Sequence, residues 1–442
     1  MFLDRKIGIT GCIVGLLMAS AASADTQVVR FLTDESDPLS VKFYNQAIKD
    51  FEAANPDIRI EMEAVNTDGL LQKKLASMNA KTMPEIFKIL PEELSEFARK
   101  GTIVPVDDIL DQIGRDDYVP GSLIPIEGKT YNIPYTMGNS GIAWVRDDLL
   151  KAKGLATPKT WDDVKQVASK LTENGTYGFV FPAGKNRVDA QFLSQLIWSA
   201  GGTYFDKDLN VTFNNPATVQ ALTFLKEMAQ YSPPGIGSYS AGDMINSYLT
   251  GKIGIDIYNP RVIANAASSA PDVFKNTSAA YLPVGPAGVG VVFSSANSYA
   301  LASEAVGAKN LDAARKFLKY IVTGDRLKDF SLTVYPHLIP PLKSVQKDVI
   351  AAGAPTLGGR PEIASVSFDT SNSLDFLTEA GAVIKDGKIT RSGVVNPYMG
   401  PIVARLIPAE VVQRVILQGE DPAEAAAWGQ KQMQAVVDDL KK

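Results

Sequence analysis

The chain has 442 residues, with 44 Lys and Arg against 49 Asp and Glu, one cysteine and one histidine. This weakly acidic balance, without a run of basic residues, argues against a nucleic acid partner. A single cysteine and a single histidine exclude a thiolate cluster and a histidine-rich metal centre. We therefore expect neither a metal nor a cofactor.

Residues 1–24 predict an export signal. Charged residues at positions 4–6 precede an apolar run at 7–18, and the segment ends in Ala22-Ser23-Ala24. This order is typical of a secretory signal peptide and predicts a periplasmic protein cut after Ala24. A lipid anchor at Cys12 is the alternative, because residues 9–12 resemble a lipoprotein box, although most of the apolar run follows that cysteine. The rest of the chain is too long for one core and indicates at least two domains.

The first elements predict a strand–helix–strand unit. Residues 26–33 read as a buried strand, and Ser36, Asp37 and Pro38 are typical of a helix start. Residues 57–65 then alternate between apolar and charged side chains, which predicts a strand with one solvated face. A strand, a helix and a second strand at this spacing indicate a parallel sheet.

The same alternation continues along the chain, so the predicted fold class is α/β. Strands are expected at 86–90 and 253–257, and Thr160 with Asp163 forms a predicted capping box. Further helices are expected at 91–101, 216–231, 242–250, 313–322, 401–417 and 422–440.

Motifs for catalysis are weak. Gly288-Val289-Gly290 lacks the third glycine of a dinucleotide fingerprint, and residues 206–210 lack the glycine and glutamate that a calcium loop needs. A secreted glycoside hydrolase stays an alternative, because two carboxylates from distant segments could meet.

The order of several short segments resembles the solute-binding proteins of carbohydrate ABC importers, the group that includes maltodextrin-binding proteins. The segments are FEAANPDI at 51–58, NIPY at 132–135, GGTYFD at 201–206, TGKIGI at 250–255 and DPAEA at 421–425. The resemblance covers nearly all of the chain after residue 24. It implies a monomeric receptor without catalytic activity that binds a carbohydrate and delivers it to ABC transporter permease subunits.

The resemblance also implies a two-lobed periplasmic binding protein fold of type II, with the ligand cleft between the lobes. We expect three hinge crossings, near 135–142, 293–298 and 338–344. The first lobe would then comprise residues 25–137 and 295–342. The second lobe would comprise residues 138–294 and 343–442, including the C-terminal helices.

Residues that could hold a sugar are taken from strand ends, helix starts and the crossings, because hydroxyl groups need fixed polar partners and C–H faces need flat rings. In the first lobe and at its crossings they are Asp34, Glu35, Asn66, Thr67, Glu92, Asn139, Asn297, Tyr335 and His337. In the second lobe they are Asp189, Gln191, Trp198, Tyr258, Asn259, Arg261, Arg360 and Tyr398.

Arg261 departs from the resemblance, because maltodextrin-binding relatives carry a sugar-stacking aromatic there. The change argues against a long glucan and favours a small, more polar or acidic sugar, with Arg360 as a second cationic contact. An ion pair on a loop is the alternative reading of Arg261. A polyamine or a glycerol phosphodiester stays open as a different ligand. Trp144 is expected in the core, whereas Trp198 is expected in the core or the cleft.

Overall fold

The computed structural model describes residues 26–65, 67–288, 293–371, 383–385, 388–390 and 396–441. The predicted signal at 1–24 and the candidate Asn66 lie outside the described residues. In the part of the chain that is described, no helix is both long and apolar enough to cross a bilayer.

The first sheet has the strand order β2-β1-β3-β12-β4, and β7 also pairs with β12. Its strands are β1 (Gln27–Thr33), β2 (Ile58–Ala64), β3 (Ile86–Ile89), β4 (Ile103–Val104), β7 (Ile133–Asn139) and β12 (Ser294–Ala302). Strand β1 runs parallel to β2 and β3, which confirms the predicted parallel unit, whereas β12 runs antiparallel to its partners.

Local chemistry explains these first elements. In β2, Ile58 and Ile60 are buried while Arg59 and Glu61 are exposed, as the alternation predicts for an edge strand with one solvated face. Between β1 and β2, helix α1 (Pro38–Ala54) begins where the Asp37 side chain accepts hydrogen bonds from the backbone of Leu39 and Ser40.

The second sheet has the order β11-β8-β10-β9. Its strands are β8 (Ile142–Arg146), β9 (Tyr177–Val180), β10 (Ile253–Tyr258) and β11 (Thr277–Tyr281). Trp144 lies in β8 and is fully buried, which confirms it as a core residue. Two short hairpins are formed by β5 (Pro125–Ile126) with β6 (Lys129–Thr130), and by β13 (Val383–Lys385) with β14 (Lys388–Thr390).

Helices surround both sheets. Those that follow first-sheet strands are α2 (Thr67–Asn79), α3 (Pro91–Arg99), α4 (Asp107–Ile113), α12 (Leu311–Ile321) and α13 (Gly324–Thr333). The others are α5 (Asp147–Ala152), α6 (Trp161–Leu171), α7 (Arg187–Ser199), α8 (Pro216–Met228), α9 (Ala241–Leu249), α10 (Arg261–Ser269), α11 (Pro271–Lys275), α14 (Lys343–Gly353), α15 (Pro361–Ser371), α16 (Met399–Ala404), α17 (Ile407–Leu417) and α18 (Pro422–Leu440). Short 3₁₀ turns lie at Arg115–Asp117, Ala229–Tyr231, Ile236–Ser238, Glu304–Val306 and Ala354–Leu357.

Most predicted helices are confirmed, and one is wrong. The capping box of α6 forms, because Thr160 and Asp163 exchange side-chain to backbone hydrogen bonds of 3.2 and 3.0 Å. The single helix expected at 401–417 is instead two helices, α16 and α17. Leu406 has a left-handed φ of 54° between them, and Pro408 lies in the first turn of α17. A proline inside a continuous helix would remove a hydrogen bond and clash with the preceding turn.

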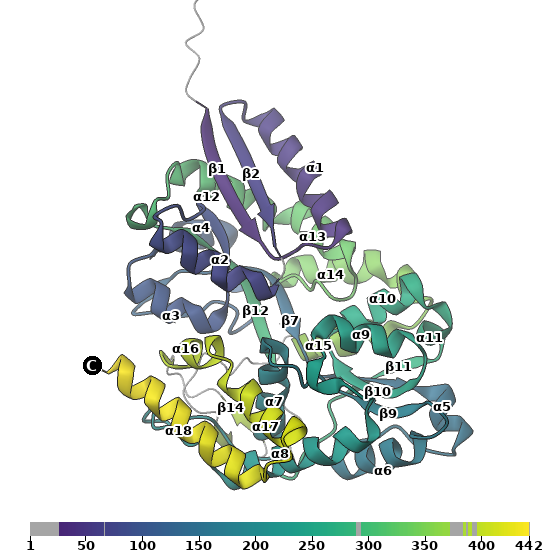
Figure 1. Cartoon of the computed structure of the whole chain (residues 1–442). Helices are drawn as coiled ribbons and strands as arrows, with labels where there is room; N and C mark the ends of the chain where they lie inside the picture. Colours follow the sequence, from purple (N-terminus) through teal and green to yellow (C-terminus); the bar gives the residue numbers. More distant parts are fainter. Residues whose placement is uncertain are drawn as a thin grey trace, which may run out of the picture.

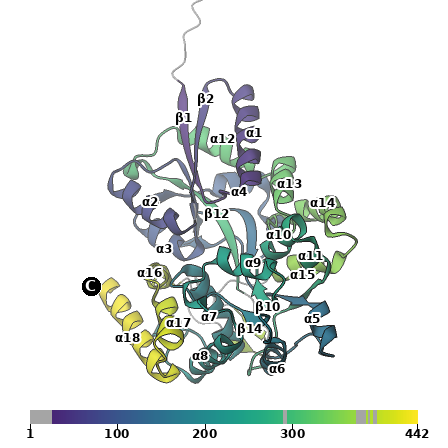
Figure 2. The same cartoon turned by 45° about the vertical axis from the view of Figure 1, so that its right-hand side comes forward.

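Three segments that are distant in sequence lie side by side between the two sheets, where the crossings are predicted. Strand β7 pairs with β12, and the Met137 N–H donates to the Ile339 carbonyl at 2.7 Å. Figure 1 shows β7 and β12 running from the first sheet, in the upper half, toward the second sheet below. The turned view in Figure 2 keeps the same two-lobed arrangement. The exact lobe boundaries at 137/138, 294/295 and 342/343 stay a proposal.

Candidate ligand-binding cleft

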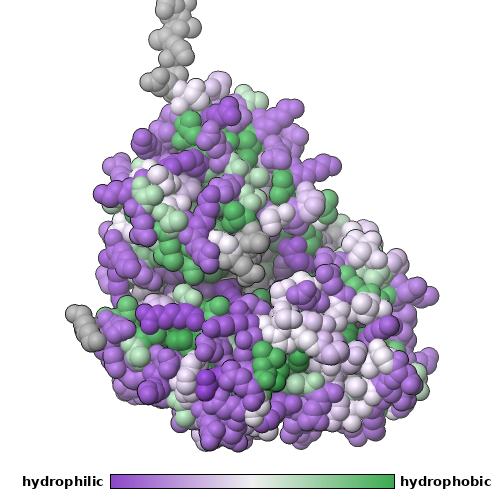
Figure 3. Space-filling view, viewed as in Figure 1, coloured by the Kyte–Doolittle hydropathy of each residue, from purple (hydrophilic) through white to green (hydrophobic). Residues whose placement is uncertain are grey.

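A cavity of ≈ 510 Å³ lies between the two lobes. In the space-filling view, hydrophilic residues dominate both lobes and the visible apolar residues form small groups (Figure 3). The cavity lining is also mostly polar, and it comes from the loops after β1 and β10, the starts of α7 and α9, and the connecting strands. Nine of the predicted candidates line it: Asp34, Glu35, Asn139, Gln191, Tyr258, Asn259, Arg261, Asn297 and His337.

Four helices begin at this cavity. Asp37 caps α1, Asn186 caps α7, Ser240 caps α9, and Arg261 is the first residue of α10. The arrangement follows from the sheets, because the carboxyl ends of their strands and the helix starts that follow face a common crevice. Backbone N–H groups and capping side chains therefore surround the cavity with fixed polar groups.

The loop after β1 supplies the acidic side of the cavity. Asp34 forms an ion pair with Lys88 of β3, and the Tyr135 hydroxyl lies 3.1 Å from Glu35 Oε1 and 3.3 Å from Asp34 Oδ1. The Tyr135 ring is fixed in turn by stacking on Tyr299 at 4.2 Å between ring centroids. Burial, and then the neighbouring Asp34 charge, raise the pKa of Glu35.

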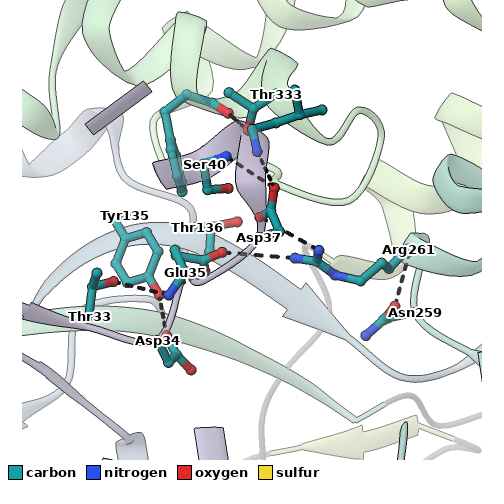
Figure 4. A network of polar contacts seen from close by, with 12 residues as sticks. Thr33, Asp34, Glu35, Asp37, Ser40, Tyr135, Thr136, Asn259, Arg261 and Thr333 are labelled. Carbon is teal, nitrogen blue, oxygen red and sulfur yellow. Dashed lines mark hydrogen bonds and ion pairs between the residues drawn. The ribbon is translucent and has the colours of Figure 1, made fainter. Parts of the chain in front are cut away.

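Arg261 faces this acidic loop from the second lobe (Figure 4). Its Nη2 lies 3.8 Å from Glu35 Oε2, and its Nη1 lies 3.8 Å from Asp37 Oδ2. The Asn259 side chain accepts the Arg261 backbone N–H at 3.0 Å. The Trp144 indole N–H lies 3.2 Å from both the Tyr258 and Asn259 carbonyls, so this buried tryptophan positions the loop that carries Arg261.

A second arginine joins the lobes at another wall of the cavity. Arg187 begins α7, and its Nε donates to Glu92 Oε1 of α3 at 2.7 Å. The Glu92 side chain is only 3% exposed. Burial alone would raise the pKa of Glu92, yet the Arg187 guanidinium beside it holds that pKa below its usual value. Glu92 therefore stands behind Arg187 and does not line the cavity.

His337 and Asn139 each bring to the cavity a polar atom that has no hydrogen-bond partner in the described part of the chain. Burial, and then the charges of Arg261 and Lys88, lower the pKa of His337 well below its usual value, so the ring is neutral at pH 7. Its Nδ1 is buried and makes no hydrogen bond to the described residues, and the same holds for Asn139 Oδ1. The Asn139 amide nitrogen donates to the Ser367 carbonyl at 3.3 Å.

The structure places five other candidates away from the cavity. Asp189 is fully buried, and burial raises its pKa well above the usual value, whereas Trp198 packs on Phe293 in the core. Tyr335 is packed near Phe368, Arg360 donates to the Thr277 carbonyl at 2.6 Å over the Phe274 ring, and Tyr398 packs on Phe205. These positions are set by packing, which strand-end position alone does not predict. No side-chain placement is described for Thr67.

Sequence reasoning missed several polar lining residues. They are Ser36, Asp37, Lys88, Ser140, Asn186, Arg187, Ser240, Asn246 and Asn265. Signals existed for some of them. Lys88 is a charged residue inside the buried strand β3, and Ser240 with Asp243 forms a capping box that marks a helix start. Within the described residues, no group of three or more His, Cys, Asp or Glu side chains could hold a metal ion.

Comparison with known proteins agrees with this architecture. A binding protein of Brucella abortus (strain 2308) is 27% identical over 413 residues, covering 87% of this chain and 98% of the relative. Among solved structures, maltose-bound MalE3 of T. maritima superposes with a TM-score of 0.77 at 18% identity, covering 92% of this chain and 100% of the other. An ABC transporter solute-binding protein of Agrobacterium radiobacter K84 in complex with ribitol has a TM-score of 0.76 at 20% identity, covering 93% and 99%.

The structural neighbours share the two-lobed periplasmic binding protein fold, which confirms the predicted fold class. The family model for the bacterial extracellular solute-binding protein matches residues 37–323, which is most of the chain. That segment contains the second sheet, the first sheet apart from β1, and most of the residues that line the cavity. The chain therefore belongs to the bacterial extracellular solute-binding proteins, the binding components of ABC transporters.

Proposed function

We propose that this protein is the periplasmic receptor of an ABC importer for a carbohydrate, a small sugar or sugar derivative. One observation carries the proposal: the cavity between the lobes is lined by polar side chains from both of them. A ligand in it would contact both lobes together and so favour their closed arrangement. The closed form would then be the state that the permease subunits accept.

The chemistry of the lining supports a polyhydroxylated ligand. Carboxylates, amides and a guanidinium offer fixed acceptors and donors, which match hydroxyl groups. Tyr258 and Phe293 add two rings that could face the C–H side of a sugar. A volume of ≈ 510 Å³ falls within the range of small-molecule sites, about 300–1,000 Å³. Solved neighbours hold maltose and ribitol, which is consistent with this ligand class.

Binding without turnover is part of the proposal. Each of the three cavity carboxylates, Asp34, Glu35 and Asp37, faces a cation, which suits a role in binding. A glycoside hydrolase needs one carboxyl group as acid and another as nucleophile or base beside the scissile bond. We expect every carbohydrate that binds to be recovered unchanged after long incubation, as measured by chromatography.

A thermal-shift screen of the purified protein tests the proposal. A ligand that binds only the folded state must raise the melting temperature. We expect a shift with at least one compound among monosaccharides, disaccharides and polyols, and a smaller radius of gyration by X-ray scattering when that compound is added. A response to polyamines or glycerol phosphodiesters, with none to any carbohydrate, would contradict the carbohydrate assignment and leave the receptor role in place.

A further inference from the structure

The charged groups of the cavity are balanced within the protein. Lys88 faces Asp34, Arg187 faces Glu92, and Arg261 faces both Glu35 and Asp37. Each cation of the lining thus already has a carboxylate beside it. An anionic ligand that approached Arg261 would also approach two carboxylates, and a cationic ligand would meet the arginine itself. Binding of a charged ligand is therefore opposed by a like charge of the protein, whether the ligand is an anion or a cation.

Arg261 keeps its hydrogen-bonding capacity in spite of these neighbours. Its two carboxylate contacts are 3.8 Å long, which is beyond a hydrogen bond, and its guanidinium makes none to the described residues. The side chain is 25% exposed. Asp37 Oδ2 is likewise buried without a hydrogen-bond partner in the described part of the chain, although Asp37 Oδ1 caps α1. Donors and acceptors thus face each other without bonding.

A hydroxyl group is the chemical group that fits between them. It can accept from the guanidinium and donate to the carboxylate at once, whereas a ligand carboxylate can only accept and an ammonium can only donate. The guanidinium offers two such places, because Nη1 faces Asp37 and Nη2 faces Glu35. Two nitrogens of one planar fork are matched by two neighbouring oxygens.

Buried amides in the same cavity have the same preference. Gln191 is 6% exposed, lines the cavity and makes no side-chain hydrogen bond to the described residues. Asn139 is 3% exposed and has a carbonyl oxygen without a partner among them. An amide side chain can both donate and accept a hydrogen bond, so these two residues also match the hydroxyl groups of a ligand.

We propose that the ligand is uncharged and carries two adjacent hydroxyl groups, which bind between the Arg261 guanidinium and the carboxylates of Glu35 and Asp37. Acid and phosphate forms of the same compound are rejected. The inference rests on the proposed function and sharpens it. Of the sequence-based expectation that Arg261 favours a small, more polar or acidic sugar, it keeps the polar sugar and reverses the acidic one. Arg261 thus determines specificity, because hydroxyl groups of the ligand bind between its guanidinium and the two carboxylates.

Isothermal titration calorimetry with matched pairs of compounds tests the inference. The pairs are D-mannitol with D-mannonate and with mannitol 1-phosphate, ribitol with D-ribonate, and maltose with maltobionate. We expect at least one uncharged member to bind and its charged counterpart to bind about 100-fold more weakly or worse, since like charges across an interface oppose binding. A charged member that binds as tightly as its neutral counterpart overturns the inference and leaves the receptor role standing.

Variants show whether these three residues cause the discrimination. Arg261→Gln should lower the affinity for the uncharged compound about 10- to 100-fold, since it removes hydrogen bonds between the ligand and a charged group. Asp37→Asn keeps a good N-cap and removes one negative charge. The ratio of the affinity for the neutral compound to that for its anionic counterpart should therefore fall about tenfold. The control is Arg326→Gln, because Arg326 is 31% exposed, pairs with Asp50 and lies outside the cavity lining.

Three further results would overturn the inference. If the ratio of neutral to anionic affinity is unchanged in Asp37→Asn, this carboxylate does not exclude anions. An unchanged affinity in Arg261→Gln, with a folded protein by circular dichroism, shows that the guanidinium does not hold the ligand. If no carbohydrate of the thermal-shift screen binds either, the carbohydrate assignment fails and the inference fails with it, so the two failures are distinguishable.

Discussion

Two arginines of the second lobe face carboxylates of the first, and they do so differently. Arg187 donates to Glu92 at 2.7 Å, and the Glu92 side chain is 3% exposed. Arg261 stays 3.8 Å from two carboxylates and makes no side-chain hydrogen bond to the described residues. The same residue type thus has a structural role in one place and stays available to a ligand in the other. The difference lies in whether the guanidinium donates a hydrogen bond to the carboxylate that it faces, as Arg187 does and Arg261 does not.

Replacing Arg187 should lower the free energy of unfolding more than any other change predicted for these residues. Arg187→Ala leaves the buried Glu92 carboxylate without its cation, and stranding a buried charge costs about 3–5 kcal/mol. We expect a fall of that order in the free energy of unfolding at pH 7, measured by urea denaturation. Arg326→Ala is the matched control, since its more exposed pair with Asp50 should contribute about 0–1 kcal/mol. Equal losses in both variants would contradict the structural role of Arg187.

Replacing Glu92 tests the same contact from its other side. Glu92→Gln keeps an oxygen for Arg187 but removes the charge, so a smaller loss of about 1–3 kcal/mol is expected at pH 7. The pKa of Glu92 is lowered in the fold, so its contribution is present above the unfolded value near 4.5 and is lost as pH falls through the folded pKa. The stability curves of wild type and variant should converge as the pH falls below the folded pKa of Glu92. A constant difference down to pH 2 would argue against the ion pair.

Asp189 provides a buried carboxyl group that faces no cation among the described residues. Its side-chain oxygens have no hydrogen-bond partner in the described residues, and burial raises its pKa well above the usual value. The folded state therefore keeps the proton, and stability falls as pH rises above the unfolded value near 3.8. We expect Asp189→Asn to raise stability by about 1 kcal/mol at pH 7, since asparagine gains no charge in the unfolded chain as the pH rises. Thermal melts from pH 3 to 8 should show the gain growing with pH.

Replacing Arg261 should have the smallest effect on stability. Arg261→Gln loses no hydrogen bond to the described residues, and its two long ion pairs are partly exposed. We expect the free energy of unfolding to change by less than about 1 kcal/mol. A loss as large as that of Arg187→Ala, measured in the same urea titration, would show that both arginines are structural and would remove the contrast between them.

Much of the fold follows from local sequence. Alternation in β2, the Asp37 cap of α1 and the capping box of α6 are readable because each depends on residues within a few positions. The division between α16 and α17 was also signalled by Pro408, and the apolar pattern around it concealed that signal. The order of segments carried the two-lobed architecture.

Which residues line the cavity depends on contacts between residues that are distant in sequence. Position after a strand identified Glu35, Asn259 and Arg261, because strand ends meet at the crevice between the lobes. The same rule selected Glu92 and Asp189, which the fold places behind the cavity wall and inside the core. Sequence by itself determined the elements, their order and the class of residues near the cleft. Tertiary structure alone decided which carboxylates have a cation and which have none, because charges interact with neighbours in space and with the water that packing removes.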